Sequence, residues 1–341
     1  LEQHNLSAST QTVQSLYHLG TALVFSQDYQ QARAILSRAV ELSKKGGLRR
    51  LEAAALTMLG QIALNCGQYK LAVEIYDRSI EVAGESYLPG MWGKFAGRGW
   101  ANLRMGNLLA ARTDFERGLD VSIQVESQYG TILMRSYLAF TALAAGESPS
   151  ASFADLEADA LTQALHPVVL FNANIQSQGW RLLRDSEKAN SAHHRAIEAA
   201  KNSDVPSFVQ SARLQKLYTQ VILEENIDPT HLEEELAELA KLTLDSGEIP
   251  LQVNTFLVRA WLHSRMGNLQ EALSTATQAL TLARACPDLP WIGECQVLLA
   301  QLFTKLGDQN QAKICTEEVH ALAKTSFAPL TVKFGGEPLA L

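Results

Sequence analysis

Two runs of side chains in this chain could in principle support chemistry, one of histidines and one of carboxylates. His193, His194 and Arg195 are consecutive in a segment with helical spacing. Adjacent residues of a helix diverge by about 100°, so the two imidazoles could not ligate one metal ion from that helix alone. We predict solvated or packing roles for both histidines. The acidic run at residues 233–235 predicts a solvent-exposed helix face.

Sequence motifs of common catalytic sites are missing. The chain has no GxxxxGK[ST], HExxH or GxSxG sequence, and Gly97-Arg98-Gly99 follows no strand, so it does not predict a dinucleotide site. The cysteines form no CxxC pair and no zinc spacing; they are Cys66, Cys286, Cys295 and Cys315. This usage predicts buried thiols in a reduced, cytoplasmic setting. We expect no enzyme activity, no metal and no cofactor.

The composition, 47% hydrophobic and 19% charged, excludes a disordered tail and a disulfide-stapled miniprotein. The net charge of −7, from 29 basic and 36 acidic residues, argues against a nucleic-acid surface spread over the whole chain. No apolar run approaches the roughly 18 residues of a membrane helix, and no secretion signal opens the sequence. Because the chain begins with Leu1-Glu2 rather than Met, we expect a fragment of a longer protein.

Three residue types recur at intervals near 40 residues. The glycines are Gly67, Gly106, Gly146, Gly267 and Gly307. The alanines are Ala32, Ala72, Ala111, Ala189, Ala272 and Ala312. The prolines are Pro89, Pro167, Pro206, Pro250 and Pro290. Agreement of three residue types on one period indicates a stacked array of repeats.

Within each repeat the apolar residues follow helical spacing, most clearly over residues 51–83. One helix is predicted to run to about Cys66, and a second to start after Gly67. Gly60 and Ala72 are small where these two helices must approach closely. The unit resembles the tetratricopeptide repeat through Leu59-Gly60, Gly67-x-Tyr69, Ala72, Tyr76 and Ser79.

The predicted fold is all-α, with about eight tetratricopeptide-like helix hairpins and a period near 40 residues. The resemblance implies a right-handed superhelix. The predicted units are 11–45, 50–84, 87–124, 127–164, 167–202, 206–244, 250–285 and 290–324, after a lead-in at 1–10 and before a tail at 325–341. Three units depart from the pattern: unit four has Ser148-Pro149-Ser150 where its second helix should begin, unit five has Arg184-Asp185 in place of the turn glycine, and unit six has a longer turn at 225–229.

The resemblance also implies a binding groove, because the first helices of tetratricopeptide units line a concave surface. The positions carried over to this chain are Tyr17, Thr21, Phe25, Thr57, Gln61, Asn65, Ala96, Trp100, Arg104, Ser136, Phe140, Asn174, Gln178, Arg181, Asn254, Trp261, Arg265, Gln301 and Lys305. Their mixture of aromatic, amide and cationic side chains would suit a carbohydrate, a peptide or an acidic ligand. The alternatives are that each arginine faces the carbonyls at a helix end, and that the aromatic residues pack between repeats.

The carboxyl end resembles the last repeats and exit segment of the MalT-like, LuxR-type bacterial transcription activators. Ser326-Phe327 and Gly336-Glu337-Pro338-Leu339 match that pattern, whereas Lys333-Phe334 stands where an acidic residue is usual. The resemblance implies the sensor domain of a signal-transduction ATPase, separated from its nucleotide-binding and DNA-binding modules. Such a fragment should bind neither ATP nor nucleic acid by itself.

Two functions from different classes remain open. One is a sensor domain that binds a small-molecule effector or a partner segment in its groove. The other is a scaffold that docks protein or peptide partners and has no small-molecule ligand. Self-association through the open end of the array is a further possibility, and no membrane partner is expected.

Overall fold

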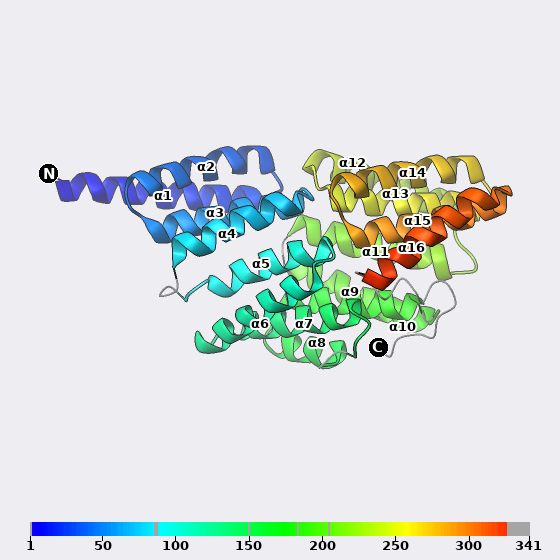
Figure 1. Cartoon of the computed structure of the whole chain (residues 1–341), viewed down its shortest axis with the longest axis horizontal. Coiled ribbons are helices and arrows are strands. Elements are labelled where there is room, and N and C mark those ends of the chain that lie inside the picture. Colours follow the sequence, from blue (N-terminus) through cyan, green and yellow to red (C-terminus); the bar gives the residue numbers. More distant parts are fainter. Residues whose placement is uncertain (1, 85–87, 149–150, 183, 204, 326–341) are drawn as a thin grey trace. The chain divides into compact units, whose positions relative to one another are not determined.

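The helical spacing of the sequence produces sixteen helices in the described part of the computed structural model, which covers residues 2–84, 88–148, 151–182, 184–203 and 205–325 (Figure 1). The first eight are α1 (Glu2–Phe25), α2 (Tyr29–Lys45), α3 (Arg49–Asn65), α4 (Tyr69–Ala83), α5 (Met91–Arg104), α6 (Leu108–Gln124), α7 (Gln128–Ala144) and α8 (Phe153–Thr162). The others are α9 (His166–Leu182), α10 (Ser186–Asn202), α11 (Pro206–Leu223), α12 (Pro229–Ser246), α13 (Ile249–Arg265), α14 (Leu269–Ala285), α15 (Leu289–Leu306) and α16 (Gln309–Thr325).

Consecutive helices form eight pairs, and this confirms the all-α prediction of about eight hairpins. Seven pairs begin within four residues of their predicted starts, the largest difference being Met91 against residue 87. The first pair begins earlier, because α1 starts at Glu2 and already contains most of the expected lead-in at 1–10. The predicted tail from residue 326 on lies outside the described residues.

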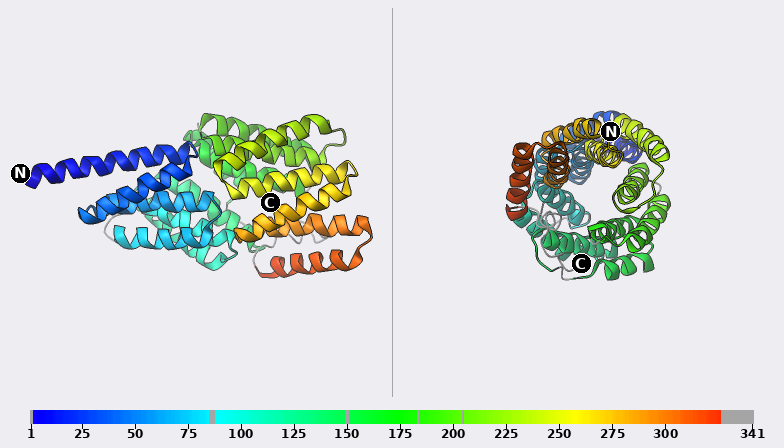
Figure 2. Two further views of the ribbon diagram at one scale, coloured as in Figure 1. Left: turned by 90° about the horizontal axis from the view of Figure 1, so that it is seen from above. Right: turned by 90° about the vertical axis from the view of Figure 1, so that its right-hand side faces the viewer.

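The packing of the helices divides the chain into two compact units. The first unit contains the chain up to Leu103 together with Leu109–Met134. The second contains Arg104–Leu108 and the chain from Arg135 on. Within the second unit, α13 to α16 follow one another as neighbours, and the first helices α9, α11 and α13 each contact the next first helix along the chain (Figures 1 and 2).

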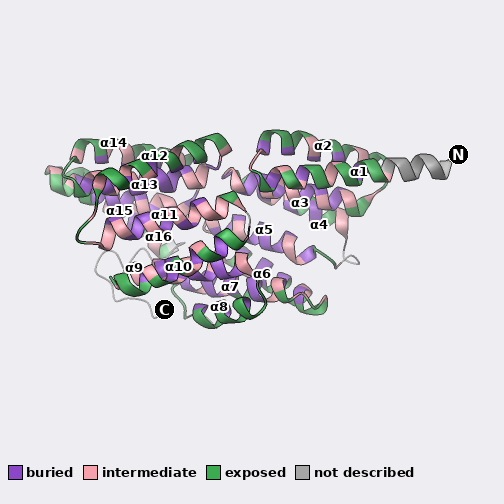
Figure 3. Ribbon diagram, turned by 180° about the vertical axis from the view of Figure 1, so that it is seen from behind, coloured by how far each residue is buried: buried purple, intermediate pink, exposed green. Residues whose placement is uncertain are grey.

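The second helix of each pair buries one side and exposes the other, as an amphipathic repeat requires, whereas first helices such as α5, α9 and α13 are buried or half-buried almost all round (Figure 3). The six periodic alanines all occupy the fourth position of the second helix of their pair, and all six are buried. In α8 and α12, which belong to two of the irregular units, Leu156 and Leu232 take this place. A small residue here lets the second helix lie close to the first.

In most pairs the turn between the two helices contains a residue with positive φ; the described turn at residues 224–228, between α11 and α12, contains none. All five periodic glycines have φ between 71° and 84°, a left-handed region that glycine adopts without steric penalty. In the fifth pair Arg184 takes this conformation with φ of 61°, and Asp185 then caps α10 by accepting the backbone N–H of Lys188 at 3.0 Å. The fifth unit therefore has Arg184 in place of the turn glycine and retains the same turn conformation.

Replacing Arg184 by glycine should stabilise the protein. The left-handed conformation costs a residue with a Cβ about 1–2 kcal/mol, and glycine adds some unfolded-state entropy, so a gain of roughly 0.5–1 kcal/mol is expected. The exposed Arg184 side chain makes no hydrogen bond or ion pair with any described residue, so little is lost. Urea denaturation of Arg184→Gly measures the gain. Glu187→Gly, in the first turn of α10, is the control and should destabilise by about 0.5–1 kcal/mol.

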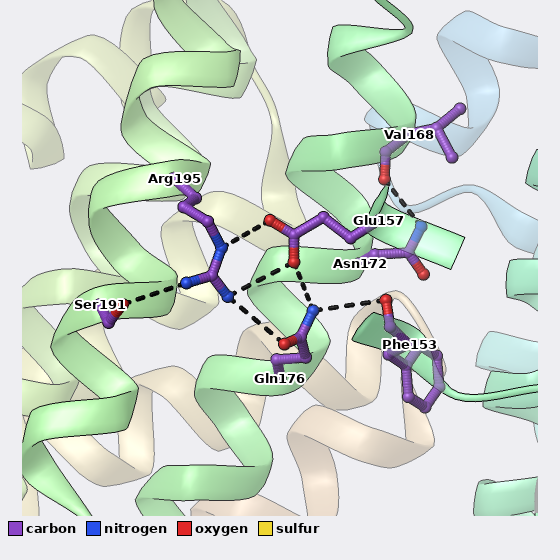
Figure 4. A network of polar contacts seen from close by, with 7 residues as sticks. All are labelled: Phe153, Glu157, Val168, Asn172, Gln176, Ser191 and Arg195. Carbon is purple, nitrogen blue, oxygen red and sulfur yellow. Dashed lines mark hydrogen bonds and ion pairs between the residues drawn. The ribbon is translucent and has the colours of Figure 1, made fainter. Parts of the chain in front are cut away.

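Polar bridges join neighbouring pairs in both units. In the bridge of Figure 4, Arg195 on α10 donates through Nε to Glu157 Oε1 on α8 at 2.6 Å and through Nη2 to Gln176 Oε1 on α9 at 3.3 Å. Gln176 Nε2 donates in turn to Glu157 Oε2. Three helices from two pairs are therefore joined around one buried carboxylate.

Two further bridges follow the same plan with different residues. On α14 and α15, Arg284 and Gln296 both donate to the carboxylate of Glu318 on α16. On α5, Arg98 donates to the buried Asp114 of α6 and at 2.5 Å to Asp77 of α4. In each bridge a first helix is tied to the second helices on both of its sides.

Candidate functional site

Five polar or aromatic side chains from four first helices of the second unit form the candidate site. They are Arg181 on α9, Gln215 and Tyr218 on α11, Trp261 on α13 and Glu294 on α15, and we refer to them as the first-helix polar cluster. Because consecutive first helices lie side by side, residues far apart in the sequence meet on this face. The cluster combines a cation, an anion, an amide and two aromatic rings.

Arg181 is the most unusual member, because its charge is buried without a carboxylate partner. The residue is 8% exposed. Its Nη1 donates to Gln215 Oε1 at 3.2 Å, and its guanidinium carbon lies 4.1 Å from the centre of the Tyr218 ring. Among the described residues no carboxylate lies within ion-pair distance of it. Burial lowers the pKa of Arg181 from its ordinary value, and Tyr218 and Glu294 partly oppose this shift.

Tyr218 connects the arginine to the carboxylate of the cluster. Its fully buried hydroxyl donates to Glu294 Oε2 at 2.8 Å. Burial and the neighbouring Glu294 raise the pKa of Tyr218 well above its ordinary value, so the phenol remains protonated and can donate. The indole Nε1 of Trp261 is buried close to this phenol and tends to lower its pKa, but makes no hydrogen bond of regular geometry.

Two asparagines extend the same helix faces by two turns. Asn174 precedes Arg181 by seven residues, and Asn254 precedes Trp261 by seven, so each pair lies on one side of its helix. The Oδ1 atoms of both asparagines are buried and accept no hydrogen bond within the described part of the chain. An unpaired buried acceptor costs about 1–3 kcal/mol. This face therefore has unused capacity to bind a polar group.

Three other predicted cations have partners elsewhere in the chain. Arg104, in the segment that belongs to the second unit, forms an ion pair with the buried Asp288 at 2.6 Å. Arg265 donates to the last carbonyls of α11, reaching Val221 O at 2.9 Å and Glu224 O at 2.6 Å, which is the capping alternative applied to a neighbouring helix. Lys305 donates to the Ser264 hydroxyl at 3.1 Å.

Of the remaining predicted positions in the second unit, Phe140 packs with its ring 6.1 Å from that of Phe171, edge to face, as in the aromatic packing alternative. Ser136 is buried and accepts from Asn172 on α9. Gln178 lies half-buried between Asn174 and Arg181, and Gln301 is exposed on α15.

The predicted positions in the first unit do not belong to the cluster. Thr21 donates to the carbonyl of Tyr17 one turn earlier, and Phe25 is exposed at the end of α1. On α3, Gln61 donates to Asn65, and Asn65 donates to the hydroxyl of Tyr29 on α2. Thr57 is bonded to Ser79, Ala96 is buried in α5, and Trp100 is half-buried there.

His193 and three of the cysteines, Cys286, Cys295 and Cys315, are buried in the core. His193 is buried and its Nε2 lies 2.7 Å from the Thr219 hydroxyl, whereas His194 is exposed. Burial lowers the pKa of His193 to about 3 and raises that of the Cys286 thiol to about 12. Within the described ranges, no group of three His, Cys, Asp or Glu side chains could hold a metal ion.

The family follows from a match over most of the sequence. The family described as the MalT-like TPR region matches residues 1–287. The chain belongs to this family. A second family, described as the tetratricopeptide repeat, matches residues 253–325. Together the matches confirm the tetratricopeptide and MalT-like assignment.

Among solved structures, the crystal structure of a Rap protein complexed with competence and sporulation factor is similar to this MalT-like chain. The TM-score is 0.44 and the sequence identity 11%, over 95% of this chain and 99% of that chain. No curated protein matches the chain. Across the described residues, no helix is both long and apolar enough to span a membrane.

The MalT-like match includes α9, α11 and α13 of the polar cluster, and Glu294 on α15 lies just beyond it. The motif at residues 326–339, which carried the resemblance at the carboxyl end, lies outside the described residues. Gln215, Tyr218 and Glu294 are the cluster members that the sequence did not predict. The usable signal was Gln215-x-x-Tyr218 on the first helix of unit six, but no groove positions were assigned to that irregular unit.

Proposed function

We propose that this chain is the sensor module of a bacterial transcription or signalling regulator, and that it acts by binding an effector or a partner segment rather than by catalysis. The observation that supports this function is the first-helix polar cluster. In this cluster the buried Arg181 has no acidic partner among the described residues, and the buried indole N–H of Trp261 donates no hydrogen bond of regular geometry. The position of the cluster on the first helices agrees with the groove that the tetratricopeptide resemblance implies. The cysteines, of which Cys286, Cys295 and Cys315 are buried, suit a cytoplasmic protein.

A ligand at this cluster could change the state of the whole module. The cluster draws on four consecutive first helices, so one bound molecule would contact several helix pairs at once. An effector shifts an equilibrium only if it binds one state more tightly than the other. Contacts with several pairs give the ligand a higher affinity for one state, because all of these contacts can form together only when the pairs have one particular spacing.

Thermal unfolding in the presence of candidate ligands tests the proposal. The panel contains metabolites, oligosaccharides, nucleotides and short peptides. A ligand at 100 times its Kd should stabilise the chain by about 2.7 kcal/mol. Trp261→Leu should abolish the effect, because it removes the buried indole N–H of the cluster. Leu244→Ala, at an exposed position on α12, is the matched control and should leave it unchanged.

A shift that survives Trp261→Leu would place binding outside the cluster. A panel without any shift would contradict the sensor function. Specific capture of a partner protein by the same chain would then favour the scaffold function.

A further inference from the structure

We infer that the first-helix polar cluster binds an organic carboxylate carrying a single negative charge, with the guanidinium of Arg181 as its direct partner. This inference rests on the proposed function, since it names the class of ligand that the same site accepts. The observation behind it is that Arg181 has no acidic partner in the described part of the chain, whereas other buried or partly buried arginines do.

The comparison starts with arginines that do have acidic partners. Arg98 bonds the buried carboxylate of Asp114, and Arg104 bonds that of Asp288. Arg195, which is more exposed than either, bonds the buried Glu157. Arg181 is more buried than Arg195, yet it has only a neutral amide and an aromatic face. A buried charge is strongly unfavourable unless it is paired and hydrogen-bonded.

The geometry of a guanidinium fits a carboxylate. Its planar fork can donate two parallel N–H bonds to the two oxygens of one carboxylate. Gln215 occupies only Nη1, so donors remain on the other nitrogens of the group. The ring of Tyr218 lies against the guanidinium and holds it in place, which reduces the entropy lost when a ligand binds.

The neighbouring Glu294 favours a singly charged ligand. Its carboxylate accepts the Tyr218 hydroxyl at the edge of the ring whose face lies against Arg181. The carboxylate of Glu294 offsets much of the positive charge of Arg181, so the second charge of a doubly charged anion such as phosphate would gain little net attraction and would still have to be desolvated. A carboxylate carries one charge and has a smaller desolvation cost. The indole N–H of Trp261 and the buried amide oxygens of Asn174 and Asn254 can bond polar groups on the rest of the molecule.

The carboxylate could be the end of a peptide or part of a small organic acid, since both present the same group. The test uses thermal unfolding of the full chain with four probes. These are hexapeptides without aspartate or glutamate and with free carboxyl ends, the same peptides with carboxyl-terminal amides, a set of aromatic and aliphatic monocarboxylates, and inorganic phosphate. We expect stabilisation by free peptides or by monocarboxylates, and none by the amidated peptides or by phosphate. Which of the two carboxylate probes acts identifies the source.

Variants of Arg181 connect the effect to the residue. Arg181→Met should abolish the carboxylate-dependent rise in Tm and leave the Tm of the ligand-free chain unchanged or higher, because it removes an unpaired buried charge. Arg181→Lys keeps the charge but not the fork, and should weaken binding at least tenfold. Arg213→Met is the matched control on α11, where the arginine pairs with the exposed Glu238, and it should bind as the unchanged chain does.

Several outcomes would overturn the inference. Carboxylate binding that persists in Arg181→Met would show that another group is the partner. A large drop in the Tm of ligand-free Arg181→Met would show a structural role instead. Stabilisation by phosphate or by neutral probes alone would overturn the carboxylate assignment, and its loss in Trp261→Leu would still support the proposed binding function. If none of the four probes stabilises the chain, the carboxylate inference fails, and the proposed function fails only if the wider panel of metabolites, oligosaccharides and nucleotides gives no shift either.

Discussion

Replacing Gly97 by alanine should lower the free energy of unfolding by about 3 kcal/mol, the upper part of the range for overpacked cores. A Cβ at this position of α5 would lie 2.2 Å from Cζ and 2.3 Å from the hydroxyl oxygen of Tyr76 on α4. The Tyr76 ring cannot retreat, because it is fully buried and also lies against Gly60, where a Cβ would be 2.8 Å from Cζ. Urea denaturation with tryptophan fluorescence measures the loss.

Gly93, on the same helix, provides the matched control. A Cβ there has no atom within 4 Å, so Gly93→Ala should stabilise the chain by up to about 1 kcal/mol through helix propensity. Combining Gly97→Ala with Tyr76→Leu should destabilise less than the sum of the two single changes, since the shorter side chain leaves room for the new methyl group. Equal stability of Gly97→Ala and Gly93→Ala would contradict the close approach of α4 and α5.

Removing Arg195 from the bridge of Figure 4 should destabilise the chain by about 2 kcal/mol, less than the loss from a fully buried ion pair because the Arg195 side chain is 37% exposed. The Glu157 side chain is only 5% exposed, and without Arg195 its carboxylate would keep Gln176 as a donor but lose its cation. Arg195→Met retains much of the aliphatic packing, so the loss reports on the charge. Chemical denaturation measures it.

An exposed pair of similar length serves as the control for this experiment. Arg38 and Glu41 on α2 are 2.7 Å apart, with side chains 57% and 48% exposed. Arg38→Met should change the free energy of unfolding by less than about 0.5 kcal/mol. Adding Glu157→Gln to Arg195→Met should restore part of the stability, because it removes the unpaired charge. A loss in Arg195→Met no larger than in Arg38→Met would show that the buried bridge contributes little.

The helix pairs could be predicted from the sequence because their determinants are local. A turn glycine needs only its own φ, and the periodic alanines mark the fourth residue of a second helix wherever the repeat is regular. Even the irregular fifth unit kept its turn, with Arg184 in the position of a glycine. The starting point of α1 could not be predicted, because nothing in the first ten residues breaks a helix.

The candidate site was predictable only in part, because its contacts join residues far apart in the sequence. Arg181, Trp261 and Asn254 were obtained from the repeat positions. Tyr218 and Glu294 were not, since the hydrogen bond between them depends on how α11 and α15 are placed around α13. Sequence position also could not distinguish Arg265, which caps α11, from Arg181, which has no acidic partner.

The hydrogen bond from Tyr218 to Glu294 connects α11 with α15, two repeats further along the chain. In a repeat array the curvature accumulates from small rotations between successive units. The hydrogen bond between Tyr218 and Glu294 fixes the distance between α11 and α15, and the rotations between the intervening units must be compatible with that distance. A molecule held by Arg181 against the ring of Tyr218 would change that distance directly. The curvature of the four pairs from α9 to α16 is therefore the property through which binding at this face would be transmitted along the chain.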